Sequence, residues 1–297
     1  MLSHLKDALT HMNYPITSHL RSKTEICRSI FDALNQTWIA FNHSEEEFGR
    51  TDSQSLYKLI LKGMIADHMQ EFLQSKELQS LVEFEPPIMN QYTLRRRGYR
   101  PNQEIGVRLR REATKEHSEA VNAYTRYKEL PQDNTSERLI KKIAQLLYVV
   151  RSNIAHGEKT PYGPDLRKAE RDEQVSEVVI PALLKLLQLI FDKPDQKLVV
   201  YGTLAPGACN EIWLKGIEGS WQDCMIRGEI KGCEGLPYFK WNFGSREIKV
   251  KMFISDYLPN ELPKLDQFEG EEYHRILIPA RIADYWIVTN VYQGKDV

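Results

Sequence analysis

Hydrophobic residues recur at three- and four-residue steps through most of the first 190 positions, which is the spacing of amphipathic helices. The first such segment covers residues 17–42 and the second covers residues 53–73. The proline pair at 86–87 then interrupts helical continuity, and a charged stretch over 103–129 is again expected to be helical. The pattern therefore predicts that the N-terminal two thirds of the chain is all-helical.

Two more helices are expected before the pattern changes. The polar run 135–138 has the composition of a helix start, and the helix that follows it is expected to end at Gly157. Residues 172–192 form the last helix, in which Pro181 predicts a kink. Residues 193–197 have the composition of a linker.

Beyond the linker the spacing of apolar residues falls from about 3.6 to 2, which is typical of strands with one buried face. Strand-like segments lie at 197–201, 225–231, 248–254, 273–280 and 285–292. A short helix is expected between residues 259 and 270. Because the helices precede the strands, we expect an α+β chain of two domains: an all-α helical bundle over 1–192 and a small β-rich domain over 198–297.

Length, charge and cysteine content agree with two domains. The chain has 297 residues, which exceeds the usual size of one domain. The 40 basic and 41 acidic side chains give a net charge of -1, so no global field attracts nucleic acid or a membrane. The four cysteines lack CxxC spacing, and no apolar run reaches the roughly 18 residues of a membrane span. We expect a cytoplasmic protein that needs no metal ion or other cofactor.

Candidate chemistry lies in the second domain, where an apolar strand ends at Tyr201 and runs into Gly202, Thr203 and Leu204. A glycine at a strand end lets backbone amides face a ligand, and such amides form a concave site for an anion such as a carboxylate. Glu269 ends the short helix further along the chain. Partial burial is expected to raise the pKa of Glu269, which suits a carboxylate that moves a proton between two nitrogens.

A family resemblance rests on three segments in this order: YGTLAPG (201–207), LDQFEGEEYHR (265–275) and VTNVYQ (288–293). Over nearly all of 197–293 the chain resembles the γ-glutamylcyclotransferase-like superfamily. The resemblance implies a compact mixed β-barrel with flanking helices, in which the loop Tyr201–Leu204 binds a small γ-glutamyl-type ligand. It further implies that Glu269 is the catalytic acid and base and that Tyr292 lines the pocket. The alternative is that Glu269 caps a turn and the loop is only a sheet corner.

The helical domain holds a second candidate site, because Arg151 and His156 lie on the last turns of its fourth expected helix. The segment VRSNIAHGEK (150–159) resembles the HEPN family (higher eukaryote and prokaryote nucleotide-binding), whose active members are metal-independent ribonucleases. The resemblance implies that Arg151 holds a phosphate and that His156, charged near a helix C-terminus, transfers the proton. Ser152 and Asn153 are the expected supporting residues. Ser152 follows the arginine directly, where many active members carry a polar residue such as Asn, and Asn153 replaces that residue only imperfectly.

The spacing of this pair has a consequence for assembly. Residues five positions apart lie about 140° apart around an ideal helix, so one chain does not direct Arg151 and His156 at one phosphate. The resemblance implies a homodimer through the helical domain, in which two such helices face each other across a shared cleft.

Positive charge is concentrated over residues 95–115, where the acidic residues are Glu104 and Glu112 and where Tyr92 and Tyr99 lie close by. Such a segment can follow an RNA backbone. The arginines expected to do so are Arg95, Arg96, Arg97, Arg100, Arg108, Arg110 and Arg111. A solvated charged surface is the alternative, because charge runs are common on protein surfaces.

Three functional hypotheses follow. The first is a HEPN-type endoribonuclease or RNA-binding dimer joined to a cyclotransferase-like small-molecule domain, which fits a toxin or antiviral defence role. The second is a γ-glutamylcyclotransferase that releases 5-oxoproline and carries a non-catalytic, dimerising helical domain. The third is a ligand-sensing interaction protein, in which a bound molecule stabilises the fold without turnover.

Overall fold

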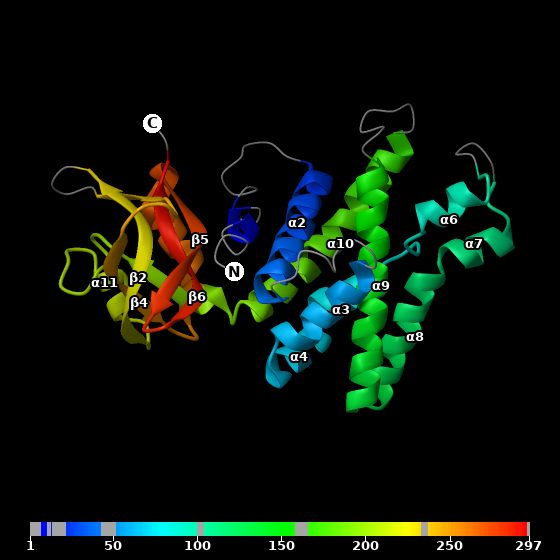
Figure 1. Cartoon of the computed structure of the whole chain (residues 1–297), viewed down its shortest axis with the longest axis horizontal. Helices are drawn as coiled ribbons and strands as arrows, with labels where there is room; N and C mark the ends of the chain where they lie inside the picture. Colours follow the sequence, from blue (N-terminus) through cyan, green and yellow to red (C-terminus); the bar gives the residue numbers. More distant parts are fainter. Residues whose placement is uncertain are drawn as a thin grey trace. The chain divides into compact units, whose positions relative to one another are not determined.

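The computed structural model describes residues 7–10, 13, 22–42, 52–99, 104–157, 166–232 and 237–295. Within these ranges the side chains of 38–42, 52–55, 62, 155–157 and 166–169 are not described. The chain divides into two compact units (Figure 1). The helical unit comprises Leu20–Ile190, and the barrel unit comprises Phe191–Val297 together with Leu2–His19.

The helical unit contains α2 (Lys23–Asn42), α3 (Asp52–Gly63), α4 (Ala66–Leu73), α5 (Lys76–Val82), α6 (Gln91–Arg96), α7 (Val107–Ala113), α8 (Lys115–Glu129), α9 (Asp133–Gly157) and α10 (Leu166–Ile190). Helix α9 packs against α3 and α8, while α10 packs against α2, α4 and α5. The buried positions of α9 keep the helical spacing seen in the sequence: Leu139, Ile143, Leu146, Leu147 and Val150. The prediction of a helical N-terminal region is confirmed for the part that the structure describes, whereas its assignment to the HEPN family stays a prediction.

Two expected helices are each divided in the structure. The segment 53–73 forms α3 and α4, because the backbone of Ile65 is extended (φ -71°, ψ 161°) between them. The charged stretch 103–129 forms α7 and α8, with Thr114 (φ -97°, ψ 8°) at the junction. Helical periodicity continues through such breaks when both helices bury the same face, so the spacing of apolar residues does not reveal them.

Helix α9 begins and ends close to the predicted positions. Its last residue is Gly157, as predicted. It begins at Asp133, because the hydroxyl of Thr135 accepts a hydrogen bond from the amide of Gln132 (3.0 Å) and donates to the carbonyl of Leu130 (2.7 Å). Helix α10 continues through Pro181 from Leu166 to Ile190.

The strands of the barrel unit are β1 (Lys197–Val200), β2 (Ser220–Lys231), β3 (Tyr238–Trp241), β4 (Glu247–Ile254), β5 (Tyr273–Ile282) and β6 (Tyr285–Gly294). Their order is β3-β2-β4-β1-β6-β5, and β2 also pairs with β5. Strands β2, β4, β1, β6 and β5 therefore close into a barrel, with β3 attached to β2. Strand β1 pairs antiparallel with β4 and parallel with β6, so the prediction of a mixed β-barrel is confirmed.

Residues of β1 contribute alternately to two apolar clusters. Val199 lies in one cluster with residues from β2, β4, β5 and β6. Leu198 and Val200 lie in the other with Leu262 and Leu265 of α12 (Leu258–Glu269). This packing fixes α12 against the strand that leads into the loop at residue 201.

The N-terminal segment groups with the barrel unit by its contacts. Asn13 pairs with strand β5 through both side-chain atoms: its Nδ2 donates to the carbonyl of Leu277 (2.7 Å), and its Oδ1 accepts from the amide of Leu277 (2.8 Å). The expected bounds of the helical domain, 1–192, stay a prediction. Among the described helices, none combines the length and the apolar content that crossing a membrane requires.

Candidate functional site

Glu269 is the last residue of α12, and the geometry of the next residue ends the helix there. Gly270 has a positive φ of 69°, which side chains disfavour, and its amide donates to the carbonyl of Asp266. The chain then makes one short turn, η3 (Gly270–Glu272), before strand β5 begins at Tyr273. The carboxyl group of Glu269 is therefore held at a sharp corner between a helix and a strand.

Burial raises the pKa of Glu269 to about 7, in agreement with the expectation from its position. Three phenols lie within its electrostatic reach: Tyr201 after β1, Tyr273 in β5 and Tyr292 in β6. The pKa of each is raised first by burial and further by the negative charge of Glu269. A half-buried carboxyl group among neutral phenols exchanges its proton near neutral pH, which suits an acid–base catalyst.

The loop that follows β1 packs against residues 237–239, which in turn contact Tyr273 at the start of β5. The ring of Tyr201 lies 5.6 Å from the ring of Phe239. A Cβ atom on Gly202 would lie 2.9 Å from Cγ of Pro237, so a side chain does not fit there without displacement. Pro237 in turn accepts a hydrogen bond from the hydroxyl of Tyr273 (3.3 Å). Glycine is therefore required at position 202 because Pro237 lies so close to its backbone, and not because of its torsion angles.

The loop closes on itself through its carbonyl groups. The amide of Ala205 donates to the carbonyl of Gly202 (3.0 Å), and the amide of Asn210 donates to the carbonyl of Thr203 (2.9 Å). Within the described ranges, the amides of Thr203 and Leu204 make no such bond. Amide groups at a strand end are suitable donors to a carboxylate.

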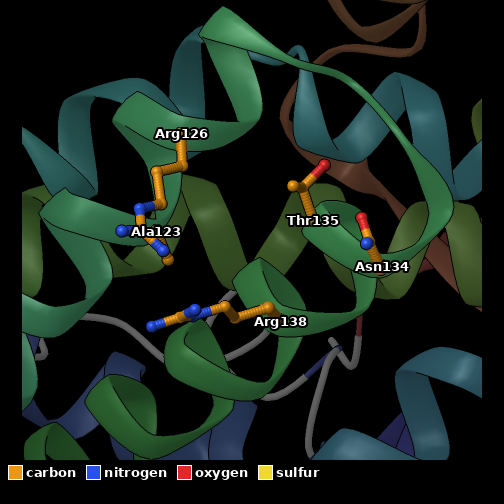
Figure 2. A pocket seen from close by; sticks show the side chains of 5 residues that line it. All are labelled: Ala123, Arg126, Asn134, Thr135 and Arg138. Atoms are coloured by element: carbon orange, nitrogen blue, oxygen red, sulfur yellow. The ribbon is translucent and has the colours of Figure 1, made fainter.

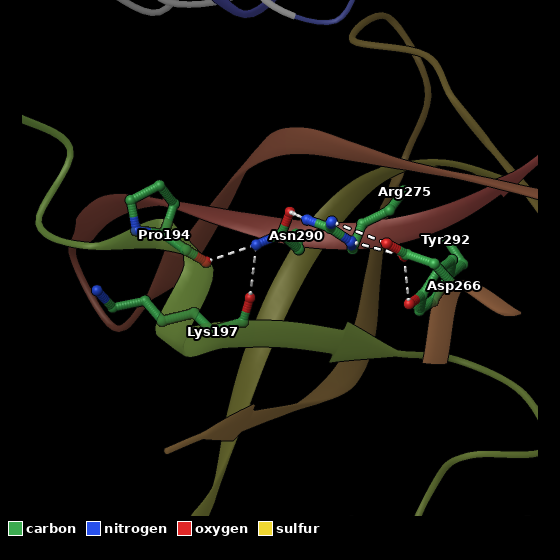
Figure 3. Close-up of polar contacts among 6 residues, drawn as sticks. All are labelled: Pro194, Lys197, Asp266, Arg275, Asn290 and Tyr292. Atoms are coloured by element: carbon green, nitrogen blue, oxygen red, sulfur yellow. Dashed lines mark hydrogen bonds and ion pairs between the residues drawn. The ribbon is translucent and has the colours of Figure 1, made fainter. Parts of the chain in front are cut away.

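Next to Glu269, a chain of polar groups crosses the barrel unit (Figure 3). Asp266 accepts from Arg275 at both carboxyl oxygens (2.8 and 3.0 Å) and from the hydroxyl of Tyr292 (2.8 Å). Arg275 also donates to Oδ1 of Asn290 (3.1 Å). No role was predicted for Asp266, Arg275 or Asn290, although the first two lie inside the LDQFEGEEYHR segment.

Tyr292 is buried, with 4% of its surface exposed. Its hydroxyl is directed to Asp266 (Figure 3). Because its hydroxyl group donates to Asp266, only the ring of Tyr292 is left to line the site.

In the helical unit, Arg151, Ser152 and Asn153 are half-buried on the last turns of α9, and the side chain of His156 lies outside the described residues. The Asn153 side chain has a structural partner at each end: Oδ1 accepts from the amide of Gln91 (3.0 Å), and Nδ2 donates to the carbonyl of Met89 (2.8 Å). Asn153 thus holds the start of α6 against the end of α9. The supporting role in catalysis expected for Asn153 stays a prediction, and the contacts observed for its carboxamide are with the backbone.

The arginine-rich segment forms the helix pair α6–α7. Arg97 donates to Glu112 (3.0 and 2.6 Å). The pKa of Glu112 is lowered chiefly by this hydrogen bond and further by the charges of Arg108 and Arg96. The arginines that are exposed to solvent are Arg95, Arg96, Arg97, Arg108, Arg110 and Arg111. Arg100 lies outside the described residues, and Tyr92 is 59% exposed.

A cavity of about 290 Å³, which was not predicted from the sequence, lies at the turn between α8 and α9. It is lined by Ala123, Arg126, Asn134, Thr135 and Arg138. The side chains of Arg126 and Arg138 extend from the two helices toward the same space (Figure 2). Two positive side chains facing one hollow favour an anion. No group of three His, Cys, Asp or Glu side chains in the described ranges is arranged to hold a metal ion.

No family model and no curated protein matches the chain. Among solved structures it is similar to YkqA from Bacillus subtilis (22% identity, TM-score 0.29), to uncharacterized protein PH0828 from Pyrococcus horikoshii (22%, 0.28) and to an AIG2-like protein from Mus musculus (17%, 0.27). The matches cover 33%, 34% and 33% of this chain and 35%, 79% and 76% of those chains, respectively. The chain thus spans about a third of the length of YkqA.

Proposed function

We propose that the barrel unit is a γ-glutamylcyclotransferase-type enzyme, which converts a γ-glutamyl amine into 5-oxoproline and the free amine. The observation that carries the proposal is Glu269, a half-buried carboxyl group whose pKa of about 7 places it between an ordinary carboxylic acid and an amine. It lies within electrostatic reach of Tyr201, the residue that opens the YGTL loop.

The chemistry requires one group that first accepts and then donates a proton. The α-nitrogen of the substrate attacks its own γ-carbonyl carbon, which forms the lactam C–N bond. The carboxylate of Glu269 takes the proton that this nitrogen loses. The C–N bond to the leaving amine then breaks, and Glu269 returns the proton to that nitrogen. No water and no redox partner is consumed, and a carboxyl group with a pKa near neutrality serves in both steps.

The loop after β1 has the groups needed to hold the other end of such a substrate. A γ-glutamyl compound carries an α-carboxylate next to its attacking amine. The amides of Thr203 and Leu204 are suitable donors to that carboxylate. Bound there, the substrate presents its amine and its γ-carbonyl toward Glu269.

The test is release of 5-oxoproline from a panel of γ-glutamyl amines, γ-glutamyl amino acids and glutathione. The Glu269→Gln variant keeps the shape but cannot accept a proton, so it should lose about 100-fold or more in turnover. Glu271→Gln is the matched control, because Glu271 is exposed in the adjacent turn. Wild-type protein that releases no 5-oxoproline from any member of the panel, or Glu269→Gln that matches it, contradicts the proposal.

A second candidate function, RNA binding by the helical unit, is favoured by one contact. Through Asn153, the start of α6 is attached to the turn of α9 that carries Arg151. The exposed arginines of α6 and α7 therefore belong to the same region of the unit as the turn that carries Arg151, although they are far from it in the sequence. A basic surface with an exposed tyrosine suits a single-stranded RNA backbone.

Binding and cleavage are tested separately. A labelled single-stranded RNA should bind at low salt and dissociate as salt rises. Cleavage with EDTA present, and its loss in His156→Ala, would extend the proposal to a HEPN-type nuclease, and sedimentation would show whether cutting requires the homodimer. Binding without cleavage limits the unit to recognition. Absence of both removes RNA as the partner.

A further inference from the structure

Asp266 is the centre of the polar chain beside Glu269. It lies three residues before Glu269 on α12, so both carboxyl groups belong to the final turn of one helix. The Asp266 side chain accepts three hydrogen bonds, two from Arg275 and one from Tyr292. Its backbone carbonyl accepts the amide of Gly270, which ends the helix. One residue thus ties the end of α12 to strands β5 and β6.

The strand register explains why these groups meet. Arg275 and Tyr292 are directly paired across β5 and β6, and Asn290 is paired with Leu198 of β1. Asn290 and Tyr292 lie two positions apart on β6, so they point to the same face of that strand. Asn290 is 3% exposed, and it donates to the carbonyls of Pro194 (2.7 Å) and Lys197 (3.4 Å). The series of hydrogen-bonded polar groups therefore connects the helix of Glu269 to the start of β1, the strand that leads into the Tyr201–Leu204 loop.

The two carboxyl groups of this turn differ in proton affinity. Burial acts to raise the pKa of Asp266, but the hydrogen bonds from Arg275 and Tyr292 and the charge of Arg275 outweigh it and lower the pKa. Asp266 remains ionised throughout the range in which Glu269 exchanges its proton. Asp266 is thus a fixed anchor, whereas Glu269 can transfer a proton.

We propose that Asp266, Arg275 and Tyr292 are positioning residues for Glu269: their bonds hold the last turn of α12 against β5 and β6 and keep water away from the Glu269 carboxyl group. The kinetic part of this inference rests on the cyclotransferase function proposed above. The structural part, the control of the environment of Glu269, does not depend on it.

Loosening this anchor has a specific consequence for Glu269. If the last turn of α12 separates from the barrel, water reaches the carboxyl group and its pKa falls toward the ordinary value of 4.5. The titratable groups that face Glu269 are Tyr201, Tyr273 and Tyr292, with Glu271 and Glu272 in the adjacent turn. The tyrosines remain neutral near pH 7, so they do not produce a shift of this kind.

The experiment compares Arg275→Met and Tyr292→Phe with Lys264→Ala. Lys264 is an exposed residue of the same helix that pairs with Glu261 (2.7 Å), so its removal controls for changes to α12 itself. The pKa of Glu269 is measured by carbon NMR titration of glutamate-labelled protein, with the signal assigned by its absence in Glu269→Gln. We expect Arg275→Met to lower this pKa by about one unit, as the net of two effects: water entry lowers it, and the charge of the unpaired Asp266 raises it by less. Tyr292→Phe, which changes no charge, should lower it by a smaller amount, and Lys264→Ala should leave it unchanged.

Activity supplies a second readout. In Arg275→Met the acidic limb of the rate profile should move to lower pH by the same amount, and kcat should fall by about tenfold with a smaller change in KM. A purely structural defect would lower the rate at all pH values without moving the limb. Arg275→Lys, which retains the charge, should restore the pKa of Glu269 part of the way to its wild-type value.

Tyr292→Phe keeps the inference testable if Arg275→Met does not fold, because it removes a single hydroxyl. If Glu269 titrates as in wild type in every folded variant, the positioning role is wrong. If the NMR shifts occur but no γ-glutamyl compound is cyclised, the positioning role stands and the proposed function fails. If turnover occurs but the pKa of Glu269 is the same in every variant, the proposed function stands and the positioning role fails.

Discussion

Each unit contains an ion pair between an arginine and a carboxylate, but the two pairs differ in their surroundings. In the barrel unit, Arg275 pairs with Asp266 in a partly buried network whose remaining polar groups are also bonded. In the helical unit, Arg97 pairs with Glu112 at the surface, and the charges of Arg108 and Arg96 act on that same carboxylate. The first arrangement fixes one geometry, whereas the second leaves an excess of positive charge.

The energetic consequences differ accordingly. An exposed ion pair contributes about 0–1 kcal/mol, because water and salt screen it. Removing one partner of a fully buried pair costs about 3–5 kcal/mol, because the other charge is left uncompensated. The pair of Arg275 and Asp266 is only partly buried, so solvent screens part of this cost. The barrel unit is thus suited to chemistry that depends on exact placement of a proton, and the helical unit is suited to attraction of a polyanion. Four predictions test this difference.

The largest expected effect concerns the close approach of Gly202 to Pro237. Gly202→Ala places a Cβ 2.9 Å from Cγ of Pro237, which displaces the loop or the partner of the Tyr273 hydroxyl. A displacement of about 1 Å can lower catalysis by about 100-fold, and we expect a loss of that order in kcat/KM for 5-oxoproline release. Gly216→Ala is the control, because nothing lies within 4 Å of its added Cβ. Equal activity of the two variants would mean that the loop does not hold the substrate.

The second prediction tests the excess charge of the helical unit. Replacing Arg96, Arg97 and Arg108 together by Ala should weaken binding of a single-stranded RNA by about 30-fold at low salt and reduce the dependence of binding on salt. The control replaces three exposed lysines outside α6 and α7: Lys76, Lys128 and Lys141. Equal losses in both triple variants would indicate attraction to net charge rather than to this surface.

The barrel was largely predictable from the sequence, because its strands alternate and its loop and helix carry ordered motifs. Strand β3 (Tyr238–Trp241) was missed, since four residues are too few to establish alternation. The equally short β1 was found because its apolar residues run directly into the YGTL loop. The raised pKa of Glu269 could be anticipated from its apolar neighbours. The pairing of Asp266 with Arg275 could not, because it depends on β5 folding back along α12.

The helical unit was predictable only in outline. The spacing of its apolar residues predicted the helical segments but not the positions at which these segments divide into two helices, as at Ile65. Asn153 was assigned to a catalytic neighbourhood, and the structure gives it two backbone partners from a segment more than sixty positions earlier. The hollow between Arg126 and Arg138 forms only when α8 and α9 fold against each other. Contacts between distant segments leave no periodic signal in one sequence.

The third prediction concerns this role of Asn153. Asn153→Ala leaves the amide of Gln91 and the carbonyl of Met89 without these partners, which should lower the free energy of unfolding of the helical unit by about 2 kcal/mol. Denaturant unfolding measures the change, with Ser152→Ala as the neighbouring control. RNA binding should weaken as well if α6 is released from α9. Unchanged stability would mean that water replaces both bonds.

The smallest effect is a gain in stability, and its sign follows from the pKa of Glu269. A carboxyl group whose pKa is higher in the folded state binds its proton more tightly there, so its contribution to stability is complete below the unfolded value of 4.5 and is lost as the pH rises through about 7. Glutamine carries no charge at any pH, so Glu269→Gln avoids this loss. The variant should be more stable than wild type at pH 8 by about 1 kcal/mol, after allowance for the solvent that screens a half-buried group. At pH 4 the two proteins should unfold alike.

Thermal unfolding at the two pH values measures this difference, and Glu271→Gln, whose side chain is exposed, should show no dependence on pH of this kind. A residue that lowers stability at the pH where it is most useful is typical of a functional site. Glu269→Gln that is no more stable than wild type at pH 8 would instead indicate that the carboxyl group is well solvated. In that case the barrel unit would resemble the helical unit, with its charge open to water, and the contrast between the two would disappear.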